Sequence, residues 1–101
     1  MKIIYSEYSL GQLQKILDFL VYKQGVPIEI ALVIRDKILD KVDNLLPNPY
    51  VAQVEEKLAH LGLSHRRIVV DNYKVVYTIK EDHILIADIF DVHQDPSKMK
   101  G

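Results

Sequence analysis

The residues best suited to chemistry are three basic side chains in the C-terminal part of the chain, Arg67, Lys74 and His93. Arginine and lysine carry fixed positive charges that can stabilise negative charge as it develops on a phosphate oxygen. Histidine titrates near neutrality, so it can donate or accept a proton. Together these groups could cleave RNA without a metal ion: a 2′-hydroxyl attacks the adjacent phosphate, the cations stabilise the charge, and an acid protonates the leaving oxygen. Such chemistry requires all three side chains on one surface.

The alternation of apolar and polar residues predicts that they share one surface. Three strands are predicted at about 64–70, 73–80 and 83–91, joined by turns at "DN" and "ED". A two-residue loop at 71–72 places Val69 opposite Lys74 and Arg67 opposite Val76, and opposed residues share a face. The other face then holds the better core residues: Arg66, Ile68, Val70, Tyr73, Val75, Tyr77 and Ile79. If the alternation continues along the third strand, Asp91 and His93 join Arg67 and Lys74 on the open face.

Asp88 fits this register poorly. The same alternation places Ile84, Ile86, Asp88 and Phe90 on the core face. A carboxylate there has to lie near an edge or pair with a cation such as Arg66, because burying an unpaired charge is costly. A slip of one residue would reverse the assignment of every side chain. A second interpretation also stays open, since surface lysines, arginines and histidines are most often simply solvated.

The elements that must position these residues begin with a short strand at 2–6. A first helix is predicted from Ser9, which forms a capping-box pattern with Gln12. Gly25 is a natural helix stop, and Pro27 suits the first turn of a second helix. The second helix presents one apolar face: Ile30, Ala31, Ile34, Ile38, Val42 and Leu45. It ends at "LPNPY", and residues 50–63 are expected to be a connector with a turn or two of helix, with Glu55 and Glu56 exposed.

The order of these elements predicts an α+β fold. We expect a short N-terminal strand and a two-helix hairpin packed on one face of a mostly antiparallel, four-stranded sheet, whose other face stays partly open. Residues 1–101 are expected to form a single domain, with a mobile tail at about 94–101.

The composition of the chain argues against several classes of protein and kinds of site. The chain is 49% hydrophobic and 27% charged, as in globular proteins, and its net charge of −1 weighs against a dedicated nucleic-acid binder. It has no cysteine, no apolar run long enough to span a membrane, no histidine spacing typical of metal sites and no glycine-rich phosphate loop. We therefore expect a cytoplasmic protein that uses no metal and no cofactor.

The segment "HRRIVVDNYKVVYTIKEDHILIADIFDVHQDPSKM" resembles the C-terminal half of the RelE/ParE toxins of type II toxin–antitoxin modules, also known as plasmid stabilization proteins. The features are an "RIVV" strand, "NYKVVY", an acidic turn, "ILIADIF" and a closing "HQDPSKM". The first half matches in outline, with a short strand, a helical hairpin and an "LPNP" stop. The resemblance covers nearly the whole chain and is most specific at residues 66–96.

The resemblance implies the same α+β fold and a toxin held inactive by a cognate antitoxin that wraps its helices and sheet. RelE-like members enter the ribosome and cleave mRNA, whereas ParE-like members are not nucleases and poison DNA gyrase. Carried over to this chain, Lys74 stands where RelE-like toxins usually have a catalytic arginine, His93 stands at the C-terminal catalytic position, and Arg67 is a supporting cation. Three alternatives stay open: the target is the ribosome with its mRNA, the target is DNA gyrase, or the chain is a degenerate relative that only binds its antitoxin. Formation of a homodimer also stays open.

Overall fold

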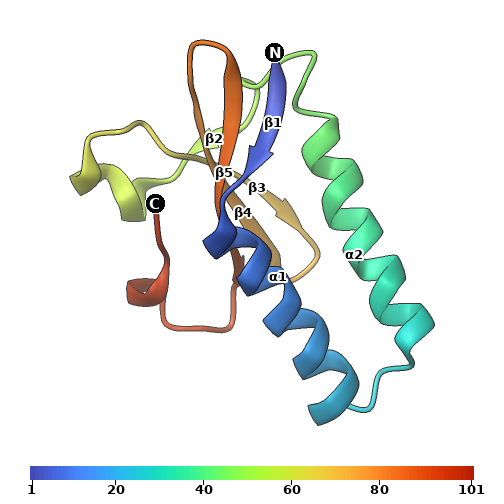
Figure 1. Cartoon of the computed structure of the whole chain (residues 1–101). Helices are drawn as coiled ribbons and strands as arrows, with labels where there is room; N and C mark the ends of the chain where they lie inside the picture. The colour runs from blue at the N-terminus through green and yellow to red at the C-terminus, as the bar shows by residue number, and fades with distance from the viewer.

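A computed structural model describes residues 1–101, which form a five-stranded sheet with two helices on one face (Figure 1). The strand order is β1-β5-β4-β3-β2, where β1 is Lys2–Tyr5, β2 Gln53–Val54, β3 Arg66–Val70, β4 Tyr73–Ile79 and β5 His83–Asp91. The pair β1–β5 is parallel and the other pairs are antiparallel. The expected α+β fold is confirmed, with one strand more than predicted: β2 is short and pairs only with the edge of β3.

The hairpin of β3 and β4 has the register expected from its two-residue loop. Val70 pairs with Tyr73, Val69 with Lys74 and Arg67 with Val76. Asp71, the first loop residue, takes a positive φ of 53°, a conformation that aspartate tolerates better than most residues.

Helix α1, Glu7–Asp18, begins earlier than the capping-box pattern predicts. The N-cap is Ser6, whose hydroxyl oxygen accepts a hydrogen bond from the Ser9 backbone N–H at 3.0 Å. The Ser9 hydroxyl donates to the Ser6 carbonyl instead of capping a helix. The helix continues into a π-helical turn, Phe19–Lys23, and Gly25 at a φ of 68° ends it as expected.

Helix α2, Ile28–Asp43, follows Pro27 and packs one side against the sheet. The central core joins both helices to one face of β3, β4 and β5, and includes Leu13, Ile16, Ile38, Val42, Val75, Tyr77, Ile84, Ile86 and Ile89. Ile30 was predicted to face this core but is 51% exposed.

Strand β5 contains a β-bulge that changes the predicted faces. Tyr77 pairs with Ile86, but Val76 pairs with Asp88, so Ala87 is an extra residue between two paired positions. From residue 88 onward the two faces are exchanged. Ile89 therefore lies in the central core, whereas Asp88 and Phe90 lie on the opposite face. The prediction that Asp88 lies on the core face, near an edge or paired with a cation such as Arg66, was wrong.

The face opposite the helices is covered, contrary to the expectation of an open face. The 3-10 helix Glu56–Leu61 and the C-terminal segment lie on this side of the sheet (Figure 1). A second apolar cluster forms there from Leu58, Val76, Phe90 and Met99. The Lys100 backbone N–H also donates to the buried Asp88 carboxylate at 2.9 Å. The segment predicted to be a mobile tail thus contributes a buried side chain, Met99, and a partly buried hydrogen bond.

The central core generates a stability prediction for α2. Ile38 is fully buried, so Ile38→Ala should lower the free energy of unfolding by about 2–5 kcal/mol. Ile30→Ala removes the same atoms from a half-exposed position on the same helix and should cost about 0.5 kcal/mol or less. Urea denaturation followed by circular dichroism measures both values. Equal losses for the two variants would contradict the packing described above.

Candidate functional site

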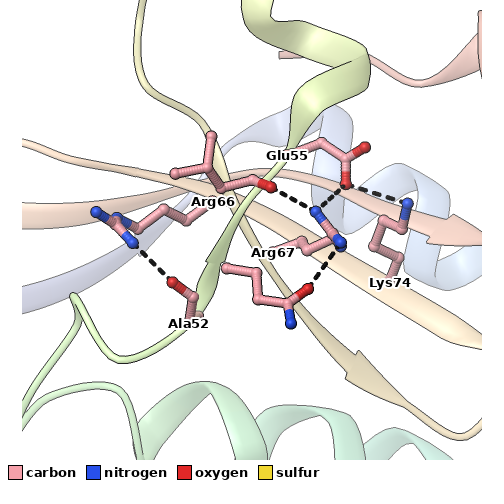
Figure 2. Close-up of polar contacts among 7 residues, drawn as sticks. Ala52, Glu55, Arg66, Arg67 and Lys74 are labelled. Carbon is pink, nitrogen blue, oxygen red and sulfur yellow. Dashed lines mark hydrogen bonds and ion pairs between the residues drawn. The ribbon is translucent and has the colours of Figure 1, made fainter.

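Glu55 is the centre of the most concentrated charge cluster in the structure. Its side chain is only 2% exposed, and its Oε2 lies 3.1 Å from Lys74 Nζ and 3.4 Å from Arg67 Nη1. Figure 2 shows both basic side chains converging on this carboxylate from neighbouring strands. Sequence analysis predicted that Glu55 is exposed, and this was wrong.

Local pairing holds the cluster together. Strand β2 pairs with β3 so that Gln53 lies opposite Arg67. The Arg67 guanidinium donates to the Gln53 side-chain oxygen at 2.8 Å and to the Val54 carbonyl. The Glu55 backbone N–H donates to the His65 carbonyl at 2.7 Å, which fixes the start of the connector beside β3. The Arg67 guanidinium is therefore held by acceptors of the protein itself (Figure 2), although 26% of the side chain is exposed.

Arg66 points away from this cluster. Its guanidinium donates to the Ala52 carbonyl at 2.7 Å and to the Tyr50 carbonyl at 3.3 Å, and it lies 5.3 Å from the centre of the Tyr50 ring. Tyr77 donates to the Pro49 carbonyl at 2.6 Å from the same face. These contacts fasten the segment after α2 to the sheet, so the role of Arg66 in the structure is to hold a loop.

His93 does not join Arg67 and Lys74. It lies beyond β5 in a hollow that it shares with α1 and with Tyr73, whose ring belongs to the central core on the helical side. The bulge at Ala87 is the physical reason: it brings Asp91 opposite Tyr73, and the Asp91 carboxylate accepts hydrogen bonds from the backbone and ring of His93. The predicted convergence of the three basic residues on one open surface was wrong.

Other buried polar groups near the cluster are structural. His65 is 2% exposed, and burial, followed by the positive charge of Lys80, lowers the pKa of its imidazole below the usual range. Burial likewise raises the pKa of Asp88, against the opposing effect of the Lys100 backbone hydrogen bond. No group of three or more histidine, aspartate or glutamate side chains is arranged to hold a metal ion.

Glu55 is the site residue that sequence reasoning missed. Nothing in the local pattern marks it, because "VAQVEEKL" has no clear period and two glutamates stand side by side. Its burial depends on β2 pairing with a strand more than ten residues further along the chain. The one signal in the sequence was that Arg67 and Lys74 lie on the same face of the sheet without a carboxylate directly opposite either one. If that face is covered, the two cations need a carboxylate partner from elsewhere in the chain.

The fold and the comparisons with known proteins define the class of protein. A family model described as the ParE toxin of the type II toxin–antitoxin system parDE matches residues 3–96. The solved structure of the chromosomal ParDE toxin–antitoxin system from P. aeruginosa is similar, with a TM-score of 0.75 and 21% sequence identity, covering 91% of this chain and 96% of that chain. No protein of curated function matches the sequence. Because the family model spans almost the whole chain, the protein belongs to the ParE family of type II toxins.

Membership in this family confirms the resemblance, which covered nearly the whole chain and was most specific at residues 66–96, and implies a cognate antitoxin as partner. None of the helices is both long and apolar enough to cross a membrane.

The buried cluster generates a second stability prediction. Lys74→Met removes one of two cations from a buried carboxylate and should lower the free energy of unfolding by about 3 kcal/mol. Lys41→Met, at an exposed position of α2, should change it by about 0.5 kcal/mol or less. The double variant Glu55→Met/Lys74→Met should recover part of the loss, because it leaves no buried carboxylate unpaired. Chemical denaturation of these variants, of the single variant Glu55→Met and of the wild type measures these differences. Purely additive losses for Glu55→Met and Lys74→Met would contradict the role given to Glu55.

Proposed function

We propose that this toxin arrests growth by binding and inhibiting DNA gyrase in the cytoplasm, and that it does so without cleaving RNA. The observation that carries the proposal is the engagement of Arg67 and Lys74 by the buried Glu55 carboxylate. Cations that neutralise an internal carboxylate are not free to stabilise a phosphate in a transition state.

The position of His93 supports the same proposal. Metal-independent RNA cleavage needs its acid and its cations within reach of one phosphate. Here the histidine lies on the helical side of the sheet and the two cations lie on the other. Among the alternatives implied by the family resemblance, this arrangement favours the ParE-like activity over the RelE-like one. The net charge of −1 also fits a protein target better than ribosomal RNA.

We further propose that the cognate antitoxin covers the apolar surface left open by the helical hairpin. A hollow of about 400 Å³ lies between α1 and α2, and hydrophobic side chains make up most of its lining, among them Leu10, Leu17, Val21, Tyr22, Ile28 and Leu32. Several of these side chains are more than one-third exposed. A continuous exposed apolar surface of this kind is typical of a protein-binding site.

The gyrase proposal predicts that the purified full-length chain abolishes supercoiling of relaxed plasmid by gyrase. The toxin–antitoxin complex serves as the control and should leave supercoiling intact, because the antitoxin holds the toxin inactive. Primer extension on mRNA after induction of the toxin should show unchanged transcripts. Full gyrase activity at excess toxin, together with codon-linked cuts in mRNA, would instead support the nuclease alternative. Growth unaffected by expression without antitoxin would indicate a degenerate relative.

The antitoxin surface can be tested with two neighbouring residues of α2. Leu32 lines the hollow between the helices, whereas Val33 is exposed but lies outside it. Leu32→Glu should weaken antitoxin binding about 30-fold, since a charge would be buried at the centre of the interface. Val33→Glu, the matched control, should change affinity less than about threefold. Calorimetric titration of toxin with antitoxin measures both, and equal effects would place the interface elsewhere.

A further inference from the structure

The largest hollow in the molecule, about 550 Å³, lies between the second half of α1 and the segment that follows β5. Its size falls in the range typical of small-molecule sites. The helix contributes Gln12, Lys15 and Phe19, and the segment at the end of β5 contributes Asp91, His93 and Gln94. None of these residues takes part in the Glu55 cluster or lines the hollow between the two helices.

The imidazole of His93 is held so that one ring nitrogen stays free. Asp91 Oδ1 accepts from the His93 backbone N–H at 2.9 Å and lies 3.0 Å from its Nδ1. A carboxylate at this distance favours the tautomer with the proton on Nδ1, which leaves Nε2 as a hydrogen-bond acceptor for another partner. The side chain is 72% exposed, so a ligand can reach it. Lys15 adds a fixed positive charge to the same hollow.

The remainder of the lining combines hydrogen-bonding groups with an aromatic wall. Gln12, Gln24 and Gln94 provide amide groups, each with both donors and an acceptor. Phe19 is 49% exposed although it is a large apolar residue. It begins the π-helical turn Phe19–Lys23, a rare backbone geometry that occurs frequently at functional sites.

We propose that this hollow binds a nucleoside phosphate. Lys15 contacts the phosphate, the base stacks on the Phe19 ring, His93 Nε2 accepts a hydrogen bond from a sugar hydroxyl, and the glutamines hydrogen-bond to polar edges of the base or sugar. Lys15 and Phe19 come from the helical wall of the hollow, and His93 and Gln94 come from the segment after β5 that faces it. One hollow thus offers a positive charge, an aromatic face and hydrogen-bonding groups, which suits a ligand with an anionic group and a flat base. This inference goes beyond gyrase inhibition and does not depend on it.

Titration of the ¹⁵N-labelled full-length chain with AMP tests the proposal. AMP should shift the backbone amide signals of Gln12, Phe19 and Gln94. Lys15→Ala and Phe19→Ala should each weaken binding about tenfold, through loss of a charged hydrogen bond and of base stacking. Lys41→Ala removes an exposed lysine from the other helix and should leave the dissociation constant unchanged.

Adenosine and inorganic phosphate are titrated in parallel, and each should bind at least tenfold more weakly than AMP. If a single-stranded oligonucleotide binds this hollow more tightly than AMP does, the nucleoside phosphate that the hollow binds belongs to a nucleic-acid strand. The proposal is overturned if AMP causes no shifts, if the shifts map to Arg67 and Lys74, or if Lys15→Ala binds AMP as tightly as Lys41→Ala does.

Discussion

One extra residue in β5 decides how the two faces of this protein are divided. Ala87 lies between the pairs Tyr77–Ile86 and Val76–Asp88, so every later side chain of the strand points to the face opposite to the one simple alternation predicts. Ser6 supports this irregularity: its hydroxyl donates to the Ala87 carbonyl at 3.2 Å, and its backbone N–H donates to the Ile86 carbonyl at 3.0 Å. Because Ser6 also caps α1, the start of the first helix and the bulge are fixed by the same residue.

The bulge gives the sheet a core on both sides. Ile89 fills the core beneath the helices, while Phe90 joins Leu58 and Met99 in the smaller cluster on the other side. The second cluster draws the 3-10 helix Glu56–Leu61 and the C-terminal segment onto a face that would otherwise be open. Glu55 directly precedes this 3-10 helix. Its burial is tolerated because Arg67 and Lys74, from β3 and β4, lie beside its carboxylate.

Residue types that suggest a nuclease therefore have another explanation in this ParE-family toxin. Arg67 and Lys74 neutralise an internal carboxylate, Arg66 holds a loop, and His93 is oriented by Asp91 in a separate hollow. Two accessible hollows lie apart from these engaged cations: the apolar hollow of the helical hairpin and the polar hollow that His93 lines. The first has the apolar lining that suits a protein partner, and the second has a polar lining with one aromatic wall.

The sequence alone is enough to predict the features that rest on neighbouring residues. These include both helices, the stop at Gly25, the register of the β3–β4 hairpin and the family resemblance, because loop length, helical spacing and alternation act within a few residues. It also contained a sign of the bulge, since Asp88 was the one residue that fitted the predicted register poorly. The other features depend on contacts between distant parts of the chain. The support of Ala87 by Ser6 spans 81 residues of sequence, and the burial of Glu55 depends on the pairing of β2 with β3. Contacts between distant segments select one face for each side chain, and that choice separated His93 from Arg67 and Lys74.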